Sequence, residues 1–221
     1  MNKLQTLIKL NFLFCFILFI NSCNVSSNNK FRETTNLNTD WQYLEKDLNN
    51  VDDALADKDW QFIKLPHTWN STDVFDTQPG YRRSGSWYKK NLKLPSKKSG
   101  SLYQLYFEGV NISSSIYLNG VKVGGHIGGY IGFTIDVTNS IKQGNNELMV
   151  YVNNGYDPEI IPSQKSDFFI YGGITRDVFL LNLPTQHIKN IKITTPKAVS
   201  YTHLRAHETR HDIVCRLLLE K

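Results

Sequence analysis

Histidine and cysteine side chains recur every four residues near the end of the chain, at His203, His207, His211 and Cys215. Both residue types are good zinc ligands, and this spacing would place all four side chains on one face of a helix. Four such positions span roughly 18 Å at a rise of 1.5 Å per residue, so one ion cannot bind them all. A native metal site here is therefore the weaker hypothesis, and we expect neither a metal nor another cofactor.

Residues 200–221 also differ in composition from the rest of the chain. They hold three of the six histidines, whereas no glycine follows Gly173 and no proline follows Pro196. The segment resembles translated sequencing-adapter sequence. We therefore predict a non-native tail at residues 200–221 and exclude it from reasoning about the fold.

The remaining sequence offers no complete catalytic pattern. It contains no Ser/His/Asp arrangement, no phosphate-binding P-loop and no zinc-ligand spacing. Asp52 and Asp53 are neighbours in the chain. We expect them to be exposed, and they do not form the spaced carboxylate pair that a hydrolase needs. No catalytic residue is therefore assigned within the chain.

The N-terminal residues 1–22 are predicted to be a lipoprotein signal peptide. Lys3 and Lys9 precede the nine apolar residues 12–20, a run too short for the roughly 20 residues that span a bilayer. The run ends in the tetrapeptide INSC at residues 20–23, which resembles a bacterial lipobox. Cys23 is thus the predicted lipid attachment site, and an ordinary signal peptide with an incidental cysteine is the alternative.

Residues 23–40 follow as a predicted flexible tether, because their first part is polar and rich in serine and asparagine. A signal peptide with a lipid-modified cysteine implies an exported bacterial lipoprotein, in the periplasm or at the outer membrane. The membrane is then a partner through the lipid at Cys23.

Length and charge limit the other possibilities. The 221 residues suffice for one domain, or for one domain and the start of another. The net charge of +5 suggests nucleic-acid binding at first sight, but it falls to +2 when residues 1–22 and 200–221 are set aside. Nucleic acid is not an expected partner, because binding it needs a concentrated basic face. The body between the two ends contains no cysteine except Cys23, so we expect a core without disulfides.

The body has the alternating pattern of β-strands. Apolar and polar residues alternate with a period of two in residues 87–94, 133–137 and 148–152. Asn119-Gly120 separates two apolar runs and is a strong signal for a two-residue hairpin turn. A helix is expected only near residues 43–56, where the pattern is weak. Many short strands between glycine-rich turns favour an all-β fold, a sandwich or jelly roll.

Pro184 ends this series of strands. Residues 187–195 (HIKNIKITT) then read as a new strand, which we interpret as the start of an incomplete second sandwich at residues 185–199. The alternative is a last strand of the first sandwich, which would leave a single domain.

Eight motifs in fixed order resemble the N-terminal sugar-binding domain of family 2 glycoside hydrolases, the β-galactosidase, β-glucuronidase and β-mannosidase group. The resemblance covers roughly residues 41–196. Its motifs are LPHTWN (65–70), SWYKK (86–90), FEGV (107–110), YLNG (117–120), GGY (128–130), FTIDV (133–137), GNNEL (144–148) and DFFIYGGITRDV (167–178).

The resemblance implies a layout and an activity. Residues 41–184 would form a jelly-roll sandwich similar to galactose-binding domains, and residues 185–199 would begin an immunoglobulin-like sandwich. A (β/α)₈ barrel would follow with two catalytic glutamates, one an acid/base and one a nucleophile. The expected chain is thus an N-terminal fragment of an exported exo-β-glycosidase, with β-galactosidase favoured, that lacks the catalytic barrel.

Asp167 is the one substrate-binding residue that the resemblance implies. In the family, the aspartate at this place reaches the barrel pocket and contacts sugar hydroxyls. A carboxylate can accept hydrogen bonds from two adjacent hydroxyls, and such charge-assisted bonds are strong. The alternative is an aspartate that caps backbone N–H groups within its own loop.

Other polar and aromatic residues of the motifs are expected to be structural. Arg176 and Asp177 should tie their loop to the sandwich, and His67 should orient a strand. The aromatic residues could stack on sugars, but core packing accounts for most of them: Trp69, Trp87, Tyr88 and Tyr130.

Two further functions compete with the fragment of a glycosidase. The chain could be a free-standing carbohydrate-binding module at the cell surface, or a purely structural domain. The sequence does not name the sugar among galactose, glucuronic acid and mannose, and it leaves the oligomeric state open.

Overall fold

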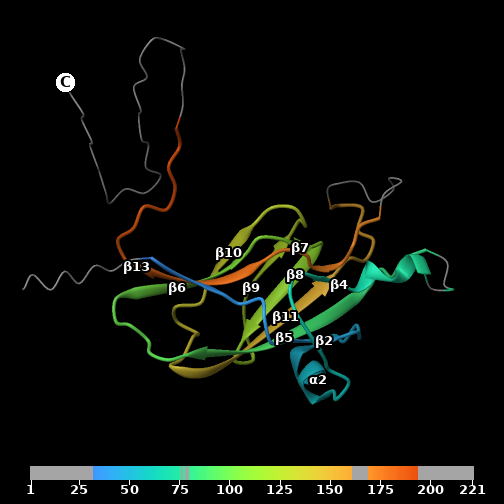
Figure 1. Ribbon diagram of the computed structural model, residues 1–221, viewed down its shortest axis with the longest axis horizontal. Helices are drawn as coiled ribbons and strands as arrows, with labels where there is room; N and C mark the ends of the chain where they lie inside the picture. The colour runs from blue at the N-terminus through green and yellow to red at the C-terminus, as the bar shows by residue number, and fades with distance from the viewer. Residues whose placement is uncertain (1–31, 76, 78–79, 161–168, 194–221) are drawn as a thin grey trace, which may run out of the picture. The chain divides into compact units, whose positions relative to one another are not determined.

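The computed structural model describes residues 32–75, 77, 80–160 and 169–193, which form an antiparallel sandwich of two main sheets (Figure 1). The predicted all-β sandwich is confirmed. The larger sheet has six strands, and all neighbouring strands within it are antiparallel. In spatial order these are β3 (Gln61–Ile63), β2 (Trp41–Leu44), β5 (Gly85–Leu94), β11 (Gly144–Asn153), β8 (Ser113–Leu118) and β9 (Val121–Ile127).

The smaller main sheet has four strands, in the order β1 (Glu33–Asn36), β13 (Val178–Pro184), β6 (Ser101–Phe107) and β10 (Phe133–Asp136). β1 pairs with the other end of the domain, with Glu33 opposite Asn182. The sandwich therefore begins before Trp41, within the residues predicted as a tether, because strand pairing and the burial of Leu37 hold this segment on the sheet.

A third sheet of three short strands joins distant parts of the chain. β12 (Gly173–Ile174) lies between β4 (His67–Thr68) and β7 (Val110–Asn111). Two short 3₁₀ turns follow β4, η2 (Trp69–Ser71) and η3 (Asp73–Phe75). This small sheet brings three segments far apart in sequence to one place, directly beside residues 169–172.

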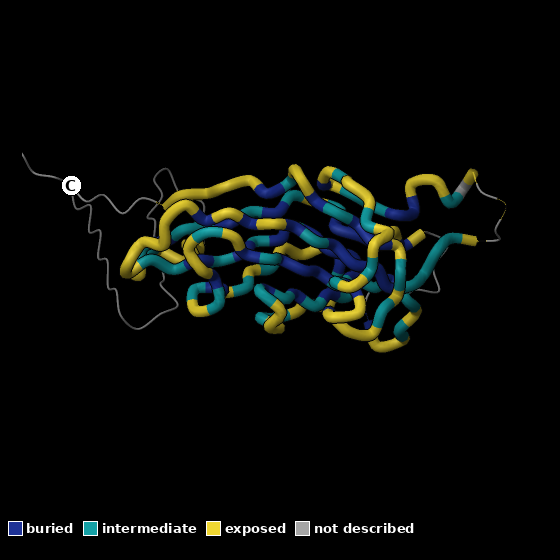
Figure 2. Tube along the Cα trace, turned by 90° about the horizontal axis from the view of Figure 1, so that it is seen from below, coloured by how far each residue is buried: buried dark blue, intermediate teal, exposed yellow. Residues whose placement is uncertain are grey.

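The main core lies between the two large sheets, where the inward-facing residues of the alternating strands meet (Figure 2). On β5, Tyr88, Leu92 and Leu94 are buried, whereas Asn91 and Lys93 are exposed. Each large apolar side chain buried in this way contributes about 1.5–3 kcal/mol of transfer free energy. The period-2 pattern of the sequence therefore predicts the inward face of this strand correctly.

A second apolar cluster covers the outer face of the six-stranded sheet. Trp87 and Met149 pack there against helix α2 (Val51–Ala56). Asn50 caps the helix, since its side chain accepts a hydrogen bond from the N–H of Asp53 at 2.8 Å. The predicted helix at residues 43–56 is thus partly wrong, because Tyr43 belongs to β2, where it pairs with β5.

The predicted hairpin turn is present. Asn119 has φ 53° and Gly120 has φ 80°, and the two residues join β8 to β9. Both φ angles are positive, as the tightest hairpin turns require. The Asn119 side chain also accepts a hydrogen bond from the N–H of Glu147 at 3.1 Å, which ties the turn to β11.

Residues 185–193 follow β13 without forming a longer strand of their own. Ile188, Ile191 and Ile193 are exposed there, and the structure assigns one isolated bridge position at Lys192. A second domain that begins at residue 185 therefore stays a prediction. Within the described ranges, no helix is long and apolar enough to cross a membrane.

Candidate functional site

The candidate site is the segment 169–173 and the loops around it. Asp167, the predicted substrate-binding residue, lies outside the described residues, as do the predicted lipid site at Cys23 and the His/Cys series of the tail. Residues 169–173 belong to the same motif as Asp167 and follow it directly in the sequence. The geometry of this segment is therefore the part of the motif that the structure describes.

Two buried asparagines hold the backbone of this segment. Asn154 donates its side-chain N–H to the carbonyl of Ile170 at 3.0 Å, and the side-chain oxygen of Asn70 accepts from the N–H of Gly172 at 2.7 Å. The two asparagine side chains also bond to each other at 3.3 Å. Residues 169–172 form no strand, so these side chains replace the backbone partners that a sheet would supply.

A third buried asparagine and a tyrosine complete the set. Asn111 donates to the carbonyl of Tyr171 at 2.6 Å, and the hydroxyl of Tyr81 accepts from the N–H of Ile170 at 3.1 Å. The side-chain oxygen of Asn111 has no hydrogen-bond partner in the described part of the chain. We call Asn70, Asn111 and Asn154 the asparagine clamp.

Three residues that follow η2 in the chain, Asp73, Arg82 and Ser84, fix the clamp from the other side. Asn70 and Asn154 both donate to the carbonyl of Arg82, at 2.9 and 3.1 Å. Asp73 accepts from the side chain of Asn70 at 2.5 Å and from the N–H of Arg82 at 2.8 Å. Ser84 donates its N–H to the oxygen of Asn154 at 3.0 Å. The amides of Asn70 and Asn154 therefore both donate and accept, which orients them uniquely.

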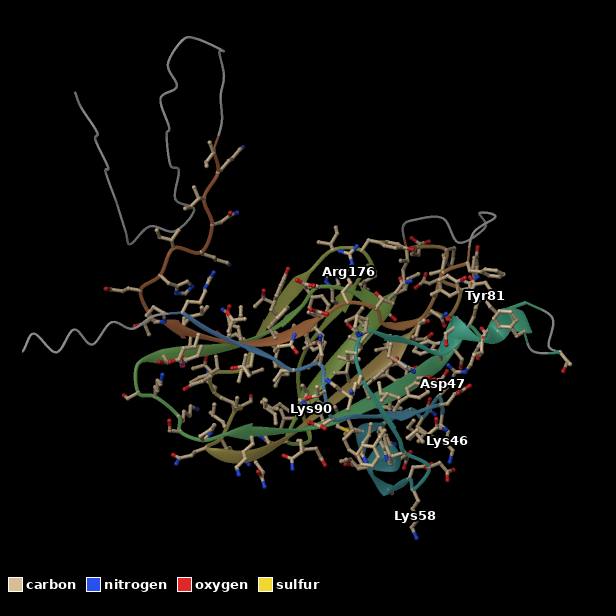
Figure 3. The ribbon with its side chains drawn as sticks, in the orientation of Figure 1. Lys46, Asp47, Lys58, Tyr81, Lys90 and Arg176 are labelled. Carbon is tan, nitrogen blue, oxygen red and sulfur yellow. The ribbon has the colours of Figure 1, made fainter. Side chains whose placement is uncertain are left out.

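An apolar cluster lies under the same segment. Ile112, Ile160 and Ile170 are buried together, and Tyr81 packs against them. Ile160 precedes residues 161–168 in the chain and Ile170 follows them. The chain is thus anchored in one cluster on both sides of the predicted site residue Asp167, and Figure 3 shows Tyr81 beside the described segment that follows.

Gly172 is required by close packing. A β-carbon at this position would overlap Cζ2 of Trp69, whose ring is nearly buried. The guanidinium of Arg82 lies over the ring of Trp69 at 5.1 Å and confines it further. The glycine therefore allows the backbone to approach the indole closely.

A row of aromatic side chains faces outward from the clamped segment. Phe169 and Tyr171 are 43% and 42% exposed, with ring centroids 6.0 Å apart. Phe169 also meets Tyr81 edge to face at 4.7 Å. The guanidinium of Arg83 lies 5.6 Å from the rings of both Tyr81 and Tyr156. Exposed aromatic faces of this kind can pack against the apolar faces of sugar rings.

His67 is structural, as predicted. Its Nδ1 lies 2.8 Å from the hydroxyl of Tyr88, and its ring packs at 4.7 Å against Tyr43. Burial lowers the pKa of His67, which favours the neutral ring. Of the four aromatic residues expected in the core, Trp69, Trp87 and Tyr88 are buried, and Tyr130 is about half exposed.

Arg176 and Asp177 tie their loop to the sandwich mainly through the backbone. The carbonyl of Asp177 accepts from the N–H of Glu108 at 3.0 Å, and Thr175 donates its N–H to the carbonyl of Gly109 at 3.1 Å. The stem of Arg176 packs over Gly109, where a β-carbon would come within 3.1 Å of it (Figure 3). Within the described residues, no ion pair joins Arg176 to Asp177.

Sequence reasoning missed the asparagine clamp. Asn70, Asn111 and Asn154 are each followed or preceded by ordinary loop and strand residues, and they are at least 41 positions apart. The order of the motifs was the available signal, because Asn70 ends one motif and Asn111 directly follows another. No local spacing connects them to residues 169–173.

The described residues thus form an antiparallel sandwich with a clamped, aromatic-edged loop, an architecture that can carry a sugar-binding site. The comparison with known families agrees, since residues 7–184 match the sugar-binding domain of the glycosyl hydrolases family 2. The chain belongs to this family.

Individual relatives support the same assignment. A protein of Formosa agariphila named "Putative beta-glucuronidase" is 61% identical over 166 residues, 75% of this chain and 20% of that protein. A β-galactosidase of Thermoanaerobacter pseudethanolicus is 34% identical and shares 75% of this chain and 23% of its own length. The crystal structure of a Bacteroides uniformis β-glucuronidase superimposes with a TM-score of 0.67 at 34% identity, covering 76% of this chain and 20% of that one. The chain thus spans about a fifth of the length of these relatives.

Proposed function

We propose that this chain is the N-terminal sugar-binding domain of an exo-β-glycosidase that hydrolyses terminal β-glycosidic bonds. The observation that carries the proposal is the clamped segment 169–173, which holds the best-matched motif of the family in a defined place beside exposed aromatic side chains. The domain would shape the substrate site. The two catalytic carboxylates lie about 5–5.5 Å apart in a retaining enzyme, and they would belong to another domain of the full-length enzyme.

Asp167 is the proposed contact to the sugar. Its carboxylate would accept hydrogen bonds from two neighbouring hydroxyls of the terminal sugar. Such bonds to a charged group are worth about 1.5–3 kcal/mol each, or roughly 10- to 150-fold in kcat/KM when one is lost.

The terminal sugar has two candidates. The sequence favours galactose, and the 61% identical relative named as a glucuronidase favours glucuronic acid. These sugars differ at C6, where glucuronic acid carries a carboxylate and galactose a hydroxymethyl group, and at C4, where the hydroxyl is equatorial in glucuronic acid and axial in galactose. Assays with the two matched nitrophenyl β-glycosides distinguish them directly.

The test uses the enzyme expressed from the complete gene that encodes this chain. We expect it to hydrolyse one of the nitrophenyl β-glycosides of galactose, glucuronic acid or mannose. Asp167→Asn should lower kcat/KM by about 10- to 100-fold. Asp52→Asn, which changes an exposed carboxylate on α2, is the matched control and should leave kcat/KM unchanged. An enzyme inactive on all three glycosides would refute the proposal.

Sugar binding without catalysis is the second candidate function, and the exposed row of Phe169, Tyr171 and Tyr156 favours it. It predicts that this chain alone binds free sugars. Isothermal titration calorimetry with galactosides, glucuronides, mannosides and plant oligosaccharides measures this directly. Absence of heat with all of them would contradict a free-standing binding module.

Export as a lipoprotein is proposed as well, on the basis of the lipobox-like sequence at residues 20–23. The lipid at Cys23 would hold the domain at a membrane surface, in the periplasm or at the outer membrane. Cells given radiolabelled palmitate should incorporate it into the wild-type protein and not into Cys23→Ala. Equal labelling of both proteins would exclude Cys23 as the attachment site.

A further inference from the structure

We propose that the asparagine clamp positions the outward-facing Phe169–Tyr171 edge for contact with the sugar substrate, so that Asn154 is a positioning residue for recognition. The inference rests on the proposed function, since it concerns the same substrate. It assigns a role to residues that touch no substrate themselves. The ligand of the edge is the pyranose ring of a β-glycoside, whose apolar face packs on the aromatic rings.

The clamp and Tyr81 together bond four backbone groups of residues 170–172. Both the N–H and the carbonyl of Ile170 are bonded to side chains, those of Tyr81 and Asn154. The carbonyl of Tyr171 is bonded to the side chain of Asn111, and the N–H of Gly172 to Asn70. The segment has no strand partners until β12 begins at Gly173. Its position is therefore set by side chains that come from three other parts of the chain.

Burial makes these bonds hard to replace. Asn70, Asn111 and Asn154 are 1%, 3% and 0% exposed. Water cannot reach a donor or acceptor that loses its partner there, so the backbone must move to find another one. A shift of about 1 Å at a substrate-contacting group can cost on the order of 10² in rate.

Asn154 is the clamp residue whose substitution tests the proposal most directly. Its N–H₂ group faces three acceptors, the carbonyls of Arg82 and Ile170 and the side-chain oxygen of Asn70. Its oxygen accepts from the N–H of Ser84. Asn154→Asp preserves the shape and the acceptor but turns the donors into an oxygen that faces three other oxygens. The Ile170 carbonyl would then be repelled rather than held.

Asn146 provides a matched control. It is 1% exposed, and its N–H₂ group donates to the carbonyls of Lys142 and Gly144 at 2.7 and 3.2 Å. Its oxygen accepts from the N–H of Lys142 at 2.7 Å. Asn146→Asp therefore removes a comparable set of buried bonds, at the opposite end of β11, without touching residues 169–173.

The experiment measures kcat and KM for Asn154→Asp and Asn146→Asp in the enzyme expressed from the complete gene. The assay temperature lies below the unfolding transition of every variant. We expect Asn154→Asp to lower kcat/KM at least tenfold, and Asn146→Asp to leave it within twofold of wild type. Equal losses in the two variants would overturn the positioning role, because they would reflect loss of stability alone.

A double-mutant cycle with Tyr171→Ala tests the link to the aromatic edge. If Asn154 acts through this edge, Asn154→Asp costs much less in the Tyr171→Ala background than in wild type. Additive losses would overturn the proposal. Should Asn154→Asp fail to fold, Tyr81→Phe takes its place in the cycle, since it removes only the hydroxyl that accepts from Ile170.

The outcome separates this inference from the proposed function. A wild-type enzyme without glycosidase activity refutes the proposed function and the positioning role together. An active wild-type enzyme in which the Asn154 and Asn146 variants behave alike refutes only the positioning role.

Discussion

The two ends of β11 each carry a buried asparagine, but the partners of the two side chains differ. At the first end, Asn146 bonds to Lys142 and Gly144, within four residues of itself, and also to Asn119 and Leu92, 27 and 54 residues away. At the other end, Asn154 bonds to Asn70 and Ile170, 84 and 16 residues away. The first end therefore takes part of its bonds from its own turn, whereas the described side-chain partners of Asn154 all come from segments distant in sequence.

This difference separates a structural end from a candidate functional end. A turn that supplies several of its own hydrogen bonds tolerates change locally. A loop cluster that depends on several segments transmits a change in one of them to the others. Paired substitutions at the two ends of β11 therefore test the comparison directly.

The largest difference is expected between two glycine substitutions. Gly172→Ala places a methyl group on the indole of Trp69 and should lower the free energy of unfolding by about 3 kcal/mol or more. Gly144→Ala has open space around its β-carbon and meets only the unfavourable φ of 90°, which costs about 1–2 kcal/mol. Urea denaturation of both variants measures the two values. A smaller loss of unfolding free energy for Gly172→Ala than for Gly144→Ala would contradict the expected difference between the two ends.

A smaller effect is expected from two tyrosine hydroxyls. The hydroxyl of Tyr81 accepts from the N–H of Ile170, and that of Tyr103 accepts from the N–H of Lys98 at 2.9 Å. Removing either hydroxyl by substitution with Phe should cost about 1 kcal/mol. Only Tyr81→Phe should accelerate hydrogen exchange of the Ile170 amide, measured by NMR. Unchanged exchange would show that the clamp does not depend on this bond.

The smallest effect concerns pH. Burial lowers the pKa of His67, which packs between Tyr43 and Tyr88 beside β12, below its ordinary value of 6.5. Protonation therefore favours the unfolded chain, so the stabilisation is complete above pH 6.5 and is lost as the pH falls toward the lowered pKa. Thermal unfolding of wild type should show a decrease in Tm from pH 7.5 to 5.5 that His67→Gln reduces. Identical pH profiles would contradict this.

The strands of the fold could be predicted where one face is apolar and the other polar. β5, β10 and the hairpin at Asn119-Gly120 follow directly from alternation and turn chemistry. Alternation places Trp87 and Met149 opposite the inward-facing residues of their strands, yet both are buried, because α2 covers the outer face of the sheet locally. An alternation of apolar and polar residues cannot reveal a strand segment that is buried on both faces.

The candidate site was predictable as a motif and not as a geometry. Residues 167–178 stand out in the sequence by their family resemblance alone. The bonds that hold residues 170–172 come from Asn70, Asn111 and Asn154, whose positions in space depend on the assembled sheets. Asparagine in a loop is common, and nothing in its neighbourhood distinguishes one that will be buried from one that will face water.

The apolar cluster under α2 contains a methionine whose oxidation can report on the opening of this helix. Met149 is the only methionine after Met1, and it is completely covered in that cluster. Peroxide can oxidise its sulfur only when the helix lifts from the sheet. The rate at which the peptide that contains Met149 gains one oxygen atom, followed by mass spectrometry after digestion, therefore records how often α2 opens.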